Sequence, residues 1–335
     1  MTQDAQYITR SNADALIPVE VSSEIIQAMP TSSAALRLFK QLPNMSAKQQ
    51  TLPIAASLPS AYFLNGDTAL KKTSKAEWDK LTLTAEEIAV IIPIPEAVLD
   101  DANYDIWGEL KPQITEAFGV AIDSAIFFGT NKPSSYPTAI VPAAIAAGNT
   151  VAVGTGSDIA DDIIGENGLM AKVEESGFRV TGFYADSTME AKFRSLRDEN
   201  GQLLYMPALT SDVPNTLVGR NLIYDNTGVF DTSSALMIAG DFSKAVYSIR
   251  QDLTYKVLDQ AIIQNTDGSI AYNLAQQDML ALRCVMRLGI QVANPVNRKT
   301  AESKYPFAVL TPAASSDESD DTEGNDDNTE TVAGT

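Results

Sequence analysis

The chain has 335 residues, of which 44% are hydrophobic and 20% charged, as is typical of soluble globular proteins. It holds no histidine and one cysteine, Cys284, which excludes an intrachain disulfide, histidine-dependent catalysis and the commonest zinc sites. The net charge is −19, and residues 313–335 hold eight acids and no base, leaving 35 acidic against 24 basic residues elsewhere, a balance that disfavours tight nucleic-acid binding. Neither a secretion signal nor a membrane span is apparent, so we expect an intracellular protein.

The N-terminal region predicts an arm. Residues 1–16 are polar and show no pattern, whereas residues 17–30 and 34–42 each place apolar side chains at helical spacing. Pro30 and Pro43 end these two patterns. The arm would have one apolar face without an obvious local partner.

Residues 49–83 predict a long hairpin with β-type segments at 50–54 and 61–64 and a strand beginning at Ala76. The sequence NGDTALKKTSK lies between them, and its Asn-Gly pair is a strong turn signal. The lysines in this turn region are also what an ordinary solvated loop would carry. Because an isolated two-stranded hairpin is marginally stable, we expect this one to lie on its own body or on a neighbouring chain.

The longest helical pattern covers residues 103–130. An extended stretch at 81–92 precedes it, followed by two prolines that should break strand pairing and a short helical turn at 96–101. Pro112 lies inside the long pattern, so we expect either a bend near it or a helix that begins there. Its apolar stripe consists of Trp107, Leu110, Ile114, Ala117, Phe118, Ala121, Ile122, Ala125 and Phe128.

A second unit follows a junction rich in proline and glycine at 131–156. A helix is predicted from Ser157 to about Ser176, then a strand at 178–185, a helix from Ser187 and a strand at 203–206. Further strands are expected at 216–224, 235–239 and 245–249, while those at 279–292 and 307–310 should close the first domain. Mixed helices and strands in this order indicate an α/β or α+β fold. The acidic segment after Pro312 is predicted to be disordered.

Three features could carry chemistry. The loop VGTGSD at 153–158 precedes a helix and could hold a phosphate, but a linker turn explains it better. The acid pairs Asp100–Asp101 and Asp161–Asp162 suit helix ends, and Trp78 and Trp107 suit a core or an interface. No catalytic, cofactor-binding or metal site is predicted.

Six stretches, taken in order, resemble the major capsid proteins of tailed bacteriophages, a fold also found in encapsulin shells. They are AEWDKLTLTAEEIAVIIPIPEAVLDDANYDIW from Ala76, DSAIFFGTNKPSSYPTAI from Asp123, MEAKFRSLRDENGQLLYMP from Met189, the strands TLVGRNLIY and IAGDFSKAVYSI, and LALRCVMRLGIQVANP. The resemblance covers residues 17–310. Their order, more than any single motif, is the specific signal.

The resemblance implies an α+β fold of the tailed-phage major capsid type. It assigns residues 1–47 to an N-terminal arm, 48–87 to an extended hairpin loop and 313–335 to the acidic tail. Residues 88–156 and 243–312 would form a peripheral domain with the long spine helix, and 157–242 an axial α/β domain. The hairpin and arm would overlie adjacent copies, and the assembly interface would include Tyr62, Phe63, Lys71, Lys72, Lys75 and Trp78.

The implied function is a structural, non-enzymatic one: hexamers and pentamers that form an icosahedral head around double-stranded phage DNA, without specific DNA binding, cofactor or membrane contact. The protein would be assembled in the host cytoplasm and belong to the virion, with separate scaffolding, portal and decoration proteins as partners. Two alternatives stay open, an encapsulin-like compartment and a histidine-free hydrolase that depends on carboxylates. A deep pocket with carboxylates of raised pKa would indicate the hydrolase.

Processing and cross-linking differ among members of the family. Many members carry a long N-terminal scaffolding segment that is cut off, whereas Met1 lies only about sixteen residues before the first arm helix; scaffolding would come from another protein unless the chain is already processed. Some members cross-link a loop lysine to an asparagine of a neighbour. Lys71 and Lys72 lie in the corresponding loop, with Asn294 or Asn297 on the closing strand, but the loop alone does not establish this chemistry.

Overall fold

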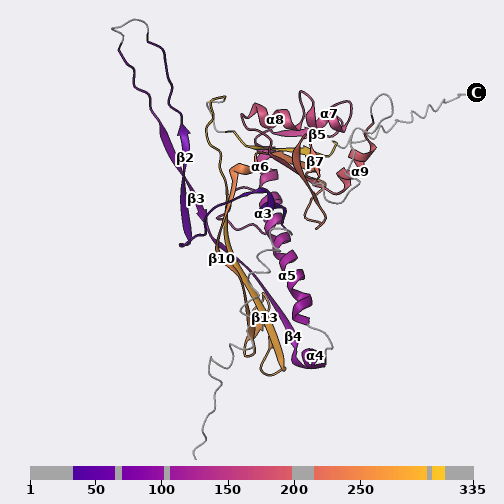
Figure 1. Cartoon of the computed structure of the whole chain (residues 1–335). Helices are drawn as coiled ribbons and strands as arrows, with labels where there is room; N and C mark the ends of the chain where they lie inside the picture. The colour runs from indigo at the N-terminus through magenta and orange to yellow at the C-terminus, as the bar shows by residue number, and fades with distance from the viewer. Residues whose placement is uncertain (1–32, 65–69, 102–105, 198–214, 300–303, 314–335) are drawn as a thin grey trace, which may run out of the picture.

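The computed structural model describes residues 33–64, 70–101, 106–197, 215–299 and 304–313. A long helix runs beside a sheet of long strands, a more compact α/β unit lies at one end, and a thin hairpin projects away from both (Figure 1). No helix in these ranges is long and apolar enough to cross a membrane. The first predicted arm helix and nearly all of the acidic tail lie outside the described residues.

The first sheet has four strands in the order β1-β10-β13-β4. Their bounds are β1 Lys40–Gln41, β4 Glu86–Pro95, β10 Ala245–Leu258 and β13 Met279–Val292. Antiparallel pairing joins β13 to both β10 and β4. The prediction that Pro93 and Pro95 break this pairing was wrong, since both are in register with β13. They are tolerated because β4 is an edge strand, where a position without a backbone donor can face solvent.

The long helix lies along this sheet. After β4 comes the short helix α4, Glu96–Asp101, as predicted, and then α5, Ile106–Asp123. Pro112 lies within α5, so the helix does not begin there; the expected bend stays a prediction. A π-helix, Ser124–Phe128, continues α5 and ends at Gly129, whose φ of 85° is left-handed. Together they bury Ile114, Phe118, Ile122, Ile126 and Phe127 in the main core.

The second sheet has six strands in the order β5-β14-β9-β6-β8-β7. Their bounds are β5 Thr150–Ala152, β6 Gly182–Asp186, β7 Thr216–Leu217, β8 Arg220–Asp225, β9 Met237–Gly240 and β14 Phe307–Thr311. Side chains alternate along each strand, so the two faces of this sheet pack into two different cores. In β6, Phe183 and Ala185 join a core with the surrounding helices, while Tyr184 joins the main core.

Four helices flank this sheet: α6 Ile140–Ala146, α7 Ile159–Ile164, α8 Leu169–Glu175 and α9 Thr188–Ser195. The single helix expected from Ser157 to Ser176 is therefore two, separated at residues 165–168, where Gly165 caps α7 and Gly168 precedes α8. The strand at 307–310 was also placed wrongly. As β14 it pairs with β5 and β9 of the second sheet rather than closing the first.

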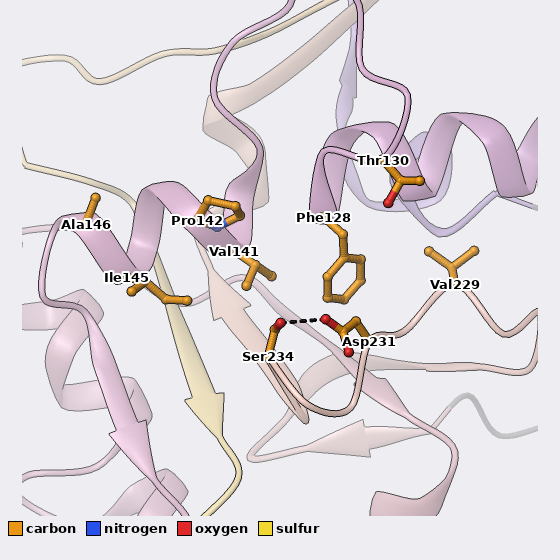
Figure 2. A pocket seen from close by; sticks show the side chains of 9 residues that line it. All are labelled: Phe128, Thr130, Val141, Pro142, Ile145, Ala146, Val229, Asp231 and Ser234. Carbon is orange, nitrogen blue, oxygen red and sulfur yellow. Dashed lines mark hydrogen bonds between the residues drawn. The ribbon is translucent and has the colours of Figure 1, made fainter. Parts of the chain in front are cut away.

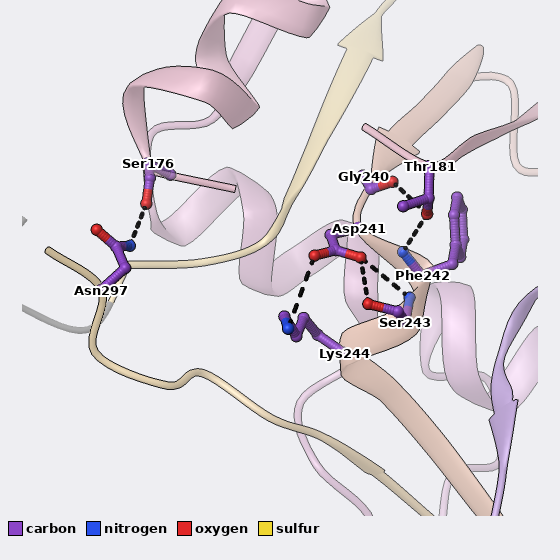
Figure 3. A network of polar contacts seen from close by, with 8 residues as sticks. All are labelled: Ser176, Thr181, Gly240, Asp241, Phe242, Ser243, Lys244 and Asn297. Atoms are coloured by element: carbon purple, nitrogen blue, oxygen red, sulfur yellow. Dashed lines mark hydrogen bonds and ion pairs between the residues drawn. The ribbon is translucent and has the colours of Figure 1, made fainter. Parts of the chain in front are cut away.

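A tight turn joins the two sheets. Between β9 and β10, Asp241 accepts hydrogen bonds from the backbone N (3.2 Å) and Oγ (2.6 Å) of Ser243, and lies 3.9 Å from Lys244 Nζ (Figure 3). Thr181 Oγ1 donates to the carbonyl of Gly240 at 3.3 Å. The following short 3-10 helix, Phe242–Lys244, leads into β10. This turn therefore fixes how the α/β unit is joined to the long strands.

Replacing Gly240 with alanine is expected to lower the free energy of unfolding by about 1–3 kcal/mol, the usual cost of overpacking a core. A Cβ at this position would lie 2.7 Å from the carbonyl oxygen of Pro306 and would overlap the Phe307 ring. Urea denaturation of the two proteins tests this. Equal urea midpoints for the two proteins would show that β9 and β14 can move apart to accept the extra methyl group without loss of stability.

The second arm helix does have a partner within its own chain, contrary to the prediction. This helix is α3, Ala34–Leu38, and its apolar residues are buried in the main core. Asp123, at the end of α5, accepts hydrogen bonds from Ser33 Oγ (2.7 Å), Ala34 N (2.8 Å) and Ala35 N (3.0 Å). The carboxylate thus caps α3 and attaches the arm to the long helix.

This attachment should depend on pH. Burial raises the pKa of Asp123 to about 6, assisted by the charge of Asp225, although the hydrogen bonds from Ser33, Ala34 and Ala35 act in the opposite direction. The folded protein therefore binds a proton more tightly than the unfolded chain, whose aspartates titrate near 3.9. Folding stability should consequently increase as the pH falls from about 6 to about 4.

Comparison with Asp123→Asn isolates this contribution, because asparagine stays neutral throughout. Relative to the variant, the wild type should gain about 2–3 kcal/mol of unfolding free energy between pH 7.5 and 4.5. Urea titrations across that range measure the difference. Parallel pH profiles would show that Asp123 is not the titrating group.

Candidate assembly interface

The projecting hairpin is attached to the body along its inner part. Strand β2, Gln49–Ser57, pairs antiparallel with β3, Glu77–Thr84. At the base, Leu83 packs in a small buried cluster with Met45, Ala85 and Val246. Farther out, Val296 N donates a hydrogen bond to the Ala55 carbonyl at 3.3 Å, and Arg298 Nη2 donates one to the Pro59 carbonyl at 3.0 Å. The outer part of the hairpin therefore projects from the body as two arms that run side by side.

Beyond β2 the hairpin is held together by side chains instead of a strand ladder. Ser60 N donates to Ser74 Oγ at 2.8 Å, and Tyr62 Oη both donates to the Lys72 carbonyl at 2.9 Å and accepts from the Lys72 amide. Lys72 Nζ also lies 5.9 Å from the centre of the Tyr62 ring. The strand predicted at 61–64 is absent, but the two arms of the hairpin stay in contact as far as Tyr62 and Lys72.

The outer hairpin exposes large apolar side chains. Phe63 is 100% exposed, Leu70 89% and Trp78 72%. Lys71 and Lys72 are exposed beside Phe63 and Leu70, whereas Lys75 forms an ion pair with Glu77 farther down. The predicted residues therefore divide into an outer group of Tyr62, Phe63, Lys71 and Lys72, and an inner pair of Lys75 and Trp78. Exposed apolar groups of this size mark interaction surfaces.

A second exposed apolar surface was missed by the sequence analysis. The hairpin of β11, Ile262–Gln264, and β12, Ile270–Asn273, exposes Ile262, Ile270 and Tyr272. Apolar residues alternating around the sequence NTDGS could have revealed it. This hairpin connects the long strands β10 and β13, and its exposed apolar residues are available for contact with another molecule.

The possible chemical sites have structural roles. In the 153–158 loop, Asp162 accepts hydrogen bonds from Gly154 N at 2.8 Å and Gly156 N at 2.6 Å, so the chain's own carboxylate occupies these donors. Asp158 caps α7 through Asp161 N. Across the described ranges, no three acids or cysteines are grouped as metal ligands would be.

An open pocket lies where the π-helix meets α6 and the loop before β9 (Figure 2). Its volume is about 430 Å³. Its lining is apolar apart from Thr130, Asp231 and Ser234, and the apolar members are Phe128, Val141, Pro142, Ile145, Ala146 and Val229. We call it the Phe128 pocket.

The chain combines a long helix on a long-stranded sheet with a separate α/β unit and a projecting hairpin. This is the fold of tailed-phage major capsid proteins. The phage capsid family matches residues 13–298, and the chain belongs to that family.

The similarity extends over nearly the whole chain. The major capsid protein of Staphylococcus phage 80alpha is 29% identical over 305 residues, which are 90% of this chain and 86% of that protein. A solved structure from Microbacterium phage Oxtober96 is 38% identical, covering 92% of this chain and 100% of its own, with a TM-score of 0.73. One from Mycobacterium phage Cain is 31% identical with the same TM-score, covering 92% and 99%.

Proposed function

We propose that the chain is the major capsid protein that self-assembles as hexamers and pentamers into the icosahedral head enclosing double-stranded phage DNA. Membership of the phage capsid family supports this function. The observation that carries it is the hairpin, whose outer end presents Phe63 and Leu70 to solvent instead of to its own body. In a closed shell such groups can be buried on adjacent copies.

The domain assignment follows the same logic. We place the arm at 1–47, the hairpin loop at 48–87, the peripheral domain at 88–156 and 243–312, and the axial domain at 157–242. Strands β5 and β14 fall within the peripheral ranges but pair in the axial sheet. The peripheral domain therefore supplies two strands to the axial domain of the same chain, which would make the two domains move together.

The predicted interface remains part of this proposal. Tyr62, Phe63, Lys71 and Lys72 would form its outer contact, while Lys75 and Trp78 would extend the contact surface toward the base. Many modest contacts of this kind add up to a stable shell while each stays weak enough to correct errors in assembly.

The same proposal covers partners and place. Separate scaffolding, portal and decoration proteins would complete the head, which is assembled in the host cytoplasm. The excess of acidic over basic residues supports enclosure of DNA without specific binding, since like charges repel. Similarity to phage proteins favours the phage head over a compartment for protein cargo.

We also infer a structural role without enzymatic activity. The hydrolase alternative requires a pocket that contains a carboxylate of raised pKa. Asp123 has the raised pKa but is only 2% exposed and caps a helix in the core. In the Phe128 pocket, hydrogen bonds from Ser233 and Ser234 lower the pKa of Asp231. These two carboxylates therefore give the hydrolase no support.

Negative-stain microscopy of the purified full chain, with and without a co-expressed scaffolding protein, tests the function. Rings or closed shells are the expected result. A protein that stays monomeric under every assembly condition would contradict the proposal.

A further inference from the structure

The walls of the Phe128 pocket are fixed by the fold. Phe128 packs edge-on against Phe230, with ring centres 5.2 Å apart. The buried Asp225 holds the loop opposite by accepting hydrogen bonds from Val229 N at 3.0 Å and Phe230 N at 3.2 Å. The hollow therefore exists before anything binds, which lowers the entropy cost of binding.

The rim of the pocket carries a fixed negative charge. Asp231 is exposed, and one of its oxygens accepts a hydrogen bond from Ser233 Oγ at 2.6 Å. The other accepts one from Ser234 Oγ at 2.5 Å (Figure 2). Among the described residues, Asp231 has no ion pair with a basic side chain. The pocket thus combines apolar walls with a carboxylate available for a cation.

Two other pockets lack this combination. The one beside Gly156 and Asp161, about 180 Å³, is bordered mainly by polar and glycine residues. The one beside Glu87 and Tyr136, about 290 Å³, has its rim acid already bonded, since Arg287 Nε donates to Glu87 Oε2 at 2.8 Å.

The outer hairpin has the complementary chemistry. Phe63 is fully exposed. Because Tyr62 is hydrogen-bonded to Lys72, Phe63 and Lys71 each lie one residue beyond this contact, on the two arms of the hairpin. Lys72 is already engaged over the Tyr62 ring, which leaves Lys71 as the cation beside Phe63. A pocket of about 430 Å³ has room for an aromatic ring. Within one chain the hairpin projects away from the α/β unit, so a second copy must supply the partner (Figure 1).

We propose that Phe63 of one subunit inserts into the Phe128 pocket of an adjacent copy, where Lys71 pairs with Asp231. This inference rests on the proposed shell function and names the surface that receives the hairpin. Burial of Phe63 supplies the affinity, and the ion pair sets the register.

A charge exchange tests the pairing. Lys71→Glu or Asp231→Lys alone should raise the protein concentration needed for half-maximal assembly about fivefold, whereas the double variant should return to near the wild-type value. Lys80→Glu is the matched control, because Lys80 is an exposed lysine of the same hairpin that lies on β3, outside the proposed contact, and it should have a smaller effect. A double variant as impaired as the two single variants combined would overturn the pairing.

A thiol cross-link tests the location without altering Phe63, Lys71 or Asp231. The native Cys284 is buried, so introduced thiols dominate the reaction. Leu64→Cys with Ile145→Cys, on the pocket wall, should give linked subunits when assembled particles are treated with a short bismaleimide. Leu64→Cys with Ile164→Cys should give few, although Ile164, on α7, is 52% exposed against 46% for Ile145.

The outcomes separate the two proposals. Wild-type protein that forms no shells would contradict the shell function itself. Shells that show neither charge rescue nor selective cross-linking through Ile145 would contradict this docking alone. Melting temperatures of the variant monomers check that any loss of assembly is not loss of folding.

Discussion

Phe118→Asp is expected to abolish folding of the subunit. Phe118 is 2% exposed and lies in the main core on α5. Losing the ring costs about 3–5 kcal/mol, and an unpaired carboxylate in the same place adds several more. Because domains are stable by only about 5–15 kcal/mol, the sum reaches the whole margin. Circular dichroism and size-exclusion chromatography should show an unfolded or aggregated chain.

A matched change on the same helix separates position from chemistry. Gln113 is exposed on α5, so Gln113→Asp should fold normally, with a change in unfolding free energy of about 0.5 kcal/mol or less. If Phe118→Asp gave a cooperative thermal transition like that of Gln113→Asp, the long helix would not be the element on which the core depends.

Removal of the outer hairpin should have the opposite effect, sparing the fold and preventing assembly. Deleting residues 61–73 and joining Ser60 to Ser74 through Asn-Gly is geometrically feasible because Ser60 N lies 2.8 Å from Ser74 Oγ. The described residues of this segment, 61–64 and 70–73, do not belong to the three buried clusters. We expect a soluble monomer with nearly unchanged melting temperature, but no shells by sedimentation or microscopy.

A smaller change to the hairpin, the reversal of two charges, should also impair assembly. Charge reversal of both Lys71 and Lys72 leaves the hairpin length unchanged and should impair assembly while sparing folding. Sedimentation velocity of each protein at matched concentrations measures this. Shells in normal yield from both the deletion and the double reversal would show that the hairpin is not an assembly contact.

Local patterns predicted much of the fold. The hairpin, the α4 helix and β13 at Met279–Val292 follow from turn signals, prolines and alternation read within short windows. The π-helix was missed because one wider turn barely changes a helical pattern. The pairing of β14 was missed because its partners lie more than 60 residues away in sequence, and no local pattern specifies them.

The candidate interface shows the same division. Sequence identified the lysines and aromatics of the hairpin, but not which of them are already engaged. Only the structure shows that Lys75 pairs with Glu77 and that Lys72 lies over Tyr62. The buried partner of α3, Asp123, lies 88 residues or more along the chain, which explains why the arm seemed to lack a local contact.

The most direct test of the account is a cryo-electron microscopy reconstruction of particles formed by the full chain. We predict closed icosahedral shells built of hexamers and pentamers, in which density for the outer hairpin lies on an adjacent subunit. Particles without icosahedral symmetry, or shells in which every hairpin contacts only its own subunit, would contradict it.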